Sequence, residues 1–153
     1  MAKRITIGAD HGGFLLKEKV ISELKKKKYK VSDLGPSSKD SCDYPAFGFS
    51  VAKKVSKKQA DRGILICRSG IGMAIVANKL PGVRAGVCNT VKDASSSREH
   101  NDANVLVLAA DRVSSKKALE ILNVWLKTKT LGGRHARRVR QIKDFEKKIF
   151  KKL

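Results

Sequence analysis

Aromatic residues are scarce in this sequence, and acidic residues are far fewer than basic ones. Only 5% of the 153 residues are Phe, Trp or Tyr, and 34 Lys and Arg stand against 14 Asp and Glu, a formal net charge of +20. Such an excess first suggests a nucleic-acid partner. Bases need aromatic stacking platforms, however, and no zinc-finger or RNP-type signature is present. We therefore expect a lysine-rich solvated surface with weak, salt-sensitive binding to polyanions and no specific nucleic-acid partner.

Long apolar runs and paired metal ligands are also missing. No run approaches the ~20 residues of a membrane helix, and residues 1–5 lack the apolar core of a signal peptide. Cys42, Cys67 and Cys88 form no C-x-x-C pair, and the three histidines show no zinc-binding spacing. We expect a cytoplasmic protein with free thiols and no membrane or metal partner.

Short apolar runs alternate with segments of helical periodicity along the chain. Strands are predicted at 4–8, 29–34, 63–67, 84–87 and 104–109, and helices at 14–28, 44–56, 71–80, 90–100, 115–127 and 135–152. This alternation predicts an α/β fold, a Rossmann-like, doubly wound sheet of five parallel strands flanked by helices. No repeat or linker is visible, so residues 1–153 are expected to form one domain.

Polar residues follow two of the predicted strands. Asp10 and His11 end the first strand, and Cys67 and Ser69 end the third. Ligands of doubly wound sheets bind outside the carboxyl ends of the strands. We therefore expect these four side chains to share one cleft.

Residues 67–72, Cys-Arg-Ser-Gly-Ile-Gly, stand where a buried strand should turn into a helix. Glycines allow close backbone approach and helix N-termini favour negative charge, so the segment predicts an anion cradle beside a thiol. Position 75 is isoleucine, not the third glycine of a dinucleotide fingerprint, and the Gly-Lys-Ser/Thr end of a Walker A loop is absent. Cys67 is therefore a candidate reactive thiolate; the alternative is an inert, buried strand end.

Two further polar segments are candidates for the site. His100 is followed by amides and a carboxylate in residues 98–104, which favours a site over a structural histidine. Arg134 and Arg138 are four residues apart, so they share a helix face and could clamp a phosphate. Their alternative role is as part of the general basic surface.

In their order along the chain, these segments resemble ribose 5-phosphate isomerases of the B type, a family shared with the galactose 6-phosphate isomerase subunits. The resemblance covers nearly the whole chain, with landmarks at 8–13, 43–45, 63–67, 69–72, 77–79, 82–85, 100–106 and 132–135. It implies an aldose–ketose isomerase of the pentose phosphate pathway. Such an enzyme interconverts ribose 5-phosphate and ribulose 5-phosphate through a cis-enediolate, without metal or organic cofactor.

The resemblance also implies roles for individual residues. Cys67 would be the base, and His100, with Asp10 as partner, would open the sugar ring. The oxyanion would be stabilised by the Ser69 hydroxyl and the amides of Arg68, Ser69, Gly70, Ile71 and Gly72. The sugar would contact Tyr44 and Asn101, and the phosphate His11, Arg134 and Arg138. The last helix would reach across a homodimer, or a tetramer, so that the site is shared between subunits.

Two positions depart from the family pattern. Arg68 stands where many relatives have glycine, and Asp111 stands where ribose-type members often carry arginine, with Arg112 one residue later. Alternative functions are a hexose 6-phosphate isomerase of the allose or galactose type, a basic nucleic-acid-binding protein and a non-catalytic paralogue. The retained candidate residues argue against the last.

Overall fold

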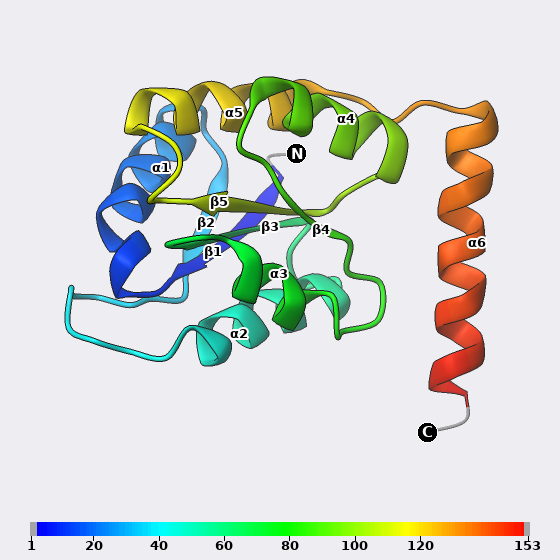
Figure 1. The fold of residues 1–153 in the computed structure, drawn as a ribbon, viewed down its shortest axis with the longest axis horizontal. Coiled ribbons are helices and arrows are strands. Elements are labelled where there is room, and N and C mark those ends of the chain that lie inside the picture. The colour runs from blue at the N-terminus through cyan, green and yellow to red at the C-terminus, as the bar shows by residue number, and fades with distance from the viewer. Residues whose placement is uncertain (1–2, 152–153) are drawn as a thin grey trace.

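The computed structural model describes residues 3–151, in which strands and helices alternate (Figure 1). The strands are β1 (Arg4–Ala9), β2 (Lys30–Asp33), β3 (Arg62–Cys67), β4 (Ala85–Val87) and β5 (Val105–Ala109). The helices are α1 (Phe14–Lys26), α2 (Tyr44–Ser56), α3 (Ile71–Ala77), α4 (Val91–Asn101), α5 (Ser115–Lys127) and α6 (Gly133–Phe150), with a 3-10 turn η1 (His11–Gly13). The predicted succession of elements is confirmed.

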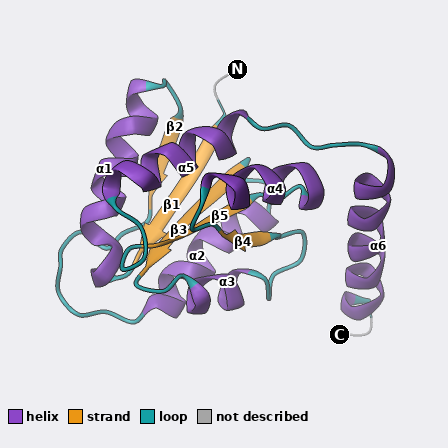
Figure 2. Ribbon diagram, turned by 45° about the horizontal axis from the view of Figure 1, so that its top comes forward, coloured by secondary structure: helices purple, strands orange, loops and turns teal. Residues whose placement is uncertain are grey.

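The strands form one parallel sheet in the order β2-β1-β3-β5-β4, which confirms the predicted doubly wound fold. Helices α1, α4 and α5 cover one face, and α2 and α3 cover the other (Figures 1 and 2). The chain passes from β1 outward to β2 and then back across β1 to β3. The winding direction therefore reverses between β1 and β3, where such sheets place their ligand crevice.

The central strand β3 is buried at every position, which explains its unbroken apolar sequence. Ile64 and Ile66 pack in the layer that contains Trp125 of α5. Leu65 and Cys67 alternate with them and pack in the layer formed with α2 and α3. Full burial of such an aliphatic side chain stabilises the fold by about 1.5–3 kcal/mol. Cys67 is thus held by the rigid centre of the molecule.

Some helix ends differ from the prediction because local contacts and backbone conformation set them. Helix α3 ends at Ala77, short of the expected residue 80. The next side chain, Asn78, accepts a hydrogen bond from the amide of Ala85 at 2.8 Å and donates one to the carbonyl of Ala85 at 3.0 Å. Helix α1 ends at Lys26 because Lys28 adopts a left-handed conformation, with φ of 63°. The expected end of the last helix at 152 lies outside the described residues.

Helix α6 lies to one side of the sheet and its flanking layers (Figure 1) and contacts α4 through a face that buries Val139. Its other apolar side chains stay open: Ile142, Phe145 and Ile149 are 46%, 63% and 59% exposed. Among residues 3–151, no helix is both long enough and apolar enough to cross a bilayer. Uncovered apolar faces of this kind are typical of surfaces that bind another protein.

Gly13 packs against the end of β3, and this contact yields a first prediction. A Cβ at this position would lie 2.5 Å from the carbonyl oxygen of Ile66, a backbone atom that cannot swing aside. Gly13→Ala should lower the free energy of unfolding by about 2–3 kcal/mol, measured by urea denaturation. Gly132→Ala is the control, because a Cβ there meets nothing within 4 Å. Equal stability of the two variants would contradict this packing.

Candidate active site

The carboxyl ends of β1 and β3 and the start of α3 border a cleft of about 440 Å³. Its lining consists of Asp10, His11, Tyr44, Cys67, Arg68, Ser69, Ile71, Gly72 and Ile75. All but Ile75 belong to the site predicted from the sequence. The grouping expected for the ends of the first and third strands is therefore present. A larger cavity, of about 680 Å³, lies at the amino edge of the sheet, but its lining includes neither cysteine nor histidine.

Cys67 is 5% exposed and lines this cleft at the end of β3. Its sulfur accepts a hydrogen bond from the amide of Gly70 at 3.2 Å. Gly70 has a φ of 78°, a left-handed conformation that glycine adopts without strain. The tight turn from β3 into α3 therefore directs a backbone N–H at the thiol.

Tyr44 and Ser69 border the same turn. A Cβ at Gly72 would lie within 2.5–2.8 Å of the Tyr44 ring and hydroxyl, so the phenol packs directly against the first turn of α3. Tyr44 is the first residue of α2, where Pro45 fits because the first turn needs no N–H donor. The Ser69 hydroxyl accepts from the amide of Ile71 at 3.3 Å.

Asp10 and His11 form the β1 side of the cleft. The Asp10 carboxylate caps η1 by accepting from the amide of Gly13 at 3.0 Å, and the residue is 7% exposed. Its own amide donates to the carbonyl of Ile66 at 3.1 Å, which joins the end of β1 to β3. His11 is held from the opposite side, with Nδ1 3.3 Å from both backbone polar atoms of Cys42. The imidazole is thus placed by the loop between β2 and α2.

The other predicted residues lie outside this cleft. Helix α4 runs antiparallel to β5, so its end, with His100 and Asn101, lies at the amino edge of the sheet. Asn101 lines a separate cavity of about 390 Å³ beside β4 and α6. Arg134 and Arg138 are exposed on α6. Within one chain, therefore, the expected pairing of His100 with Asp10 is not formed.

His100 instead contacts α6. Its ring stacks on that of His135 with centroids 4.3 Å apart and planes 11° from parallel. Desolvation lowers the pKa of His135, and the charges of His100, Arg134 and Arg138 lower it further. Glu99, 4.0 Å from His100, places a negative charge at the same junction and acts in the opposite direction.

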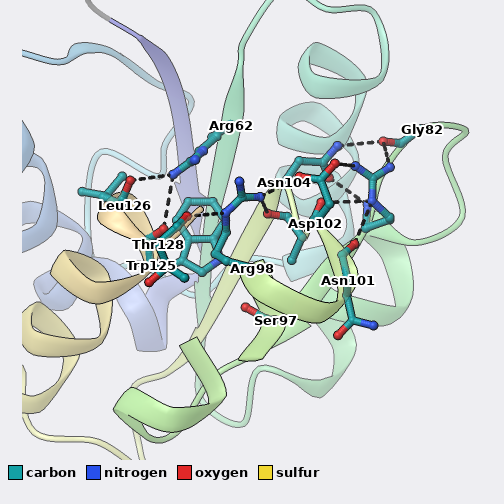
Figure 3. A network of polar contacts seen from close by, with 12 residues as sticks. Arg62, Gly82, Ser97, Arg98, Asn101, Asp102, Asn104, Trp125, Leu126 and Thr128 are labelled. Atoms are coloured by element: carbon teal, nitrogen blue, oxygen red, sulfur yellow. Dashed lines mark hydrogen bonds and ion pairs between the residues drawn. The ribbon is translucent and has the colours of Figure 1, made fainter. Parts of the chain in front are cut away.

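An ion network fixes the end of α4 (Figure 3). Asp102, in a left-handed conformation, bridges Arg84 and Arg98 through its two carboxylate oxygens, each at 3.0 Å. Arg98 also donates to the carbonyl of Ala103, and its guanidinium lies over the ring of Trp125, 5.9 Å from the centroid. Arg84 donates to the carbonyls of residues 101 and 102. The helix end that carries His100 and Asn101 is therefore anchored to the core.

A doubly wound sheet with a thiol, a carboxylate and a glycine-rich turn at its switch point is the scaffold of an α/β enzyme for small anionic substrates. Residues 5–142 match the family model described as Ribose/Galactose Isomerase, and the chain belongs to this family.

Proteins similar to the chain carry more specific names. It is 40% identical to ribose-5-phosphate isomerase B of Escherichia coli (strain K12) over 146 residues, 95% of this chain and 98% of that protein. The structure of ribose-5-phosphate isomerase B from Clostridium thermocellum aligns with a TM-score of 0.93 at 49% identity, covering 95% and 99% of the two chains. The Mycoplasma genitalium enzyme with bound ribulose-5-phosphate aligns with a TM-score of 0.92 at 42% identity, covering 96% and 98%.

The sequence did not indicate the contact between the two positions that depart from the family pattern. Arg68 and Asp111 form an ion pair with an N···O distance of 3.5 Å. Asp111 lies two residues after the end of β5, which pairs with β3, so the rule about strand ends could have placed it near the cleft. Ile75 was missed because it looks like an ordinary apolar helix residue, yet it is 57% exposed.

The Asp102 network predicts a large cost for its removal. Asp102→Ala leaves two mostly buried guanidiniums without a carboxylate and should lower the free energy of unfolding by about 3 kcal/mol, measured by urea denaturation. Asp102→Asn should lower the free energy of unfolding by less, because asparagine tolerates the left-handed backbone conformation. Glu120→Ala, which breaks an exposed ion pair with Lys117, is the control and should cost under ~1 kcal/mol. A loss at Asp102 no larger than at Glu120 would contradict the anchoring role.

Proposed function

We propose that this chain is an aldose–ketose isomerase that interconverts ribose 5-phosphate and ribulose 5-phosphate, with Cys67 as the catalytic base. The observation that carries the proposal is the cleft itself, where a thiol, a buried carboxylate and a histidine meet at the switch point of the sheet. The similarity to enzymes named ribose-5-phosphate isomerase B supports the five-carbon substrate. The family description also names galactose, so six-carbon sugar phosphates are the alternative substrates.

The chemistry needs one base that serves two neighbouring carbons. The Cys67 thiolate would take the proton from C2 of the open-chain aldose, and the carbonyl oxygen on C1 would take up the negative charge, which gives a cis-enediolate. The proton of the hydroxyl on C2 would pass to the oxygen on C1. The sulfur would then return its proton to C1, and the oxygen on C2 would become the ketose carbonyl. The Gly70 amide, 3.2 Å from the sulfur, would stabilise the thiolate. The substrate is neither oxidised nor reduced overall, so a base and hydrogen-bond donors to the enediolate oxygen are sufficient for the reaction.

The remaining cleft residues would bind and orient the substrate. Tyr44, packed on the first turn of α3, would contact the sugar, and His11 would face its phosphate. The Ser69 hydroxyl and the amides of residues 68–72 would stabilise the enediolate oxygen. His100, with Asp10, would open the furanose ring before proton transfer.

His100 can take this role only if a second copy of the chain supplies it. The cleft ends at an apolar rim, where Ile71 and Ile75 are 54% and 57% exposed. The cavity beside Asn101 has partly apolar walls, including Val83 and Ile142, and would accept such a rim. In a two-fold symmetric dimer, the rim of each chain would pack into the cavity of the other chain, so the same contact would form twice. A homodimer would thus bring His100, Asn101, Arg134 and Arg138 of one protomer to the cleft of its partner.

Cys67→Ala tests the base assignment. The variant should lose nearly all turnover of ribose 5-phosphate in a coupled assay of ribulose 5-phosphate formation, by at least ~10³-fold, while the fold is kept. Cys88→Ala is the matched control and should remain active. Burial raises the pKa of Cys88 to about 11, and its side chain packs in the opposite layer from Cys67. Substantial activity in Cys67→Ala would rule out the thiol as base.

A further inference from the structure

The cleft contains very little positive charge of its own for a substrate with a phosphate group. Among the residues that line it, Arg68 is the only Lys or Arg, and His11 is the only other group that can become cationic. Asp10 adds a negative charge. Arg134 and Arg138 do not line this cleft in their own chain. The binding of a dianion therefore depends strongly on where the Arg68 side chain lies.

The Arg68 side chain lies across η1. A Cβ at Gly12 would come within 2.6 Å of its Cγ and 3.1 Å of its Nε, so the side chain passes directly over the residue that follows His11. The absence of a side chain at position 12 makes room for this course. The side chain thereby crosses the turn that follows Asp10 and His11 and lines the cleft, while 61% of it stays exposed.

Asp111 orients the Arg68 guanidinium but leaves most of its hydrogen-bond donors free. The Asp111 amide donates to the Arg68 carbonyl at 3.0 Å, so the two side chains start from paired backbone positions. Their charged groups approach to 3.5 Å, and the two side chains are 61% and 55% exposed. An ion pair this exposed is weak. Most of the five guanidinium donors remain available to another anion.

The geometry points to Arg68 as a phosphate-binding residue for the cleft of its own chain, with Asp111 as the positioning residue that holds the guanidinium until substrate arrives. This inference rests on the proposed function. A phosphate monoester carries more charge than a carboxylate and offers three acceptor oxygens, so it would draw the guanidinium from Asp111. Arg68 and His11 would bind the phosphate end, and Cys67 and Ser69 would face the reacting carbons.

Arg68→Met tests the inference, because methionine keeps an unbranched stem over Gly12 and removes the charge. We expect KM for ribose 5-phosphate to rise about tenfold or more, with kcat within about threefold of wild type. The dissociation constant of inorganic phosphate, measured by calorimetric titration, should rise by a similar factor. Arg112→Met is the matched control, since it removes the same charge from a residue that does not line the cleft. It should leave both constants nearly unchanged.

Three results would overturn the inference. Unchanged KM and phosphate affinity in Arg68→Met would make Arg68 a surface residue. Equal weakening in both variants would show that net charge is responsible. A fall in kcat at constant KM would place the guanidinium at the reacting carbons. Failure of the proposed function is recognised separately, as wild-type protein that does not turn over ribose 5-phosphate, because phosphate titration requires no turnover.

Discussion

The hydrogen bond from the Asp10 amide to the Ile66 carbonyl joins the ends of β1 and β3, and the geometry of the cleft depends on this junction. It extends the parallel ladder just past the last residue of β1, where the sheet reverses its winding. Asp10 and His11 are thereby placed beside Cys67, and Gly13 packs on the β3 backbone. The thiol and the carboxylate are held by the most buried part of the sheet, and the imidazole is held by the loop between β2 and α2. This is the rigid support that the proposed proton transfer would need.

The same parallel topology divides the predicted site. Asp10 and Cys67 stand at the carboxyl ends of β1 and β3, which lie at one edge of the sheet. Each connecting helix returns the chain to the opposite edge. His100 and Asn101, at the end of α4, must therefore lie far along the sheet from the thiol of their own chain. The Asp102 network then fixes this helix end to Trp125 and the core. The end of α4 is thus firmly held, at a place where the proposed homodimer would let another protomer use His100 and Asn101.

Much of this could be predicted from the sequence. Alternating apolar and helical segments gave the order of elements, and the rule for strand ends correctly grouped Asp10, His11, Cys67 and Ser69. The end of α3 could not be predicted, because it depends on the pairing of the Asn78 side chain with the backbone of Ala85, which leaves no periodic signal. The separation of His100 from Asp10 follows from helix direction, which the motif alone does not show. The course of Arg68 over Gly12 depends on side-chain packing, which likewise leaves no signal in the sequence.

A mixed dimer would show whether one catalytic site needs two copies of the chain. Cys67→Ala and His100→Asn chains carrying different tags are co-expressed, and the heterodimer is isolated through both tags. In the proposed arrangement one of its two sites combines intact Cys67 with intact His100, so it should regain about half of wild-type turnover while each parent dimer remains poorly active. A heterodimer no more active than its parents would contradict the shared site and place both residues in one chain's own chemistry.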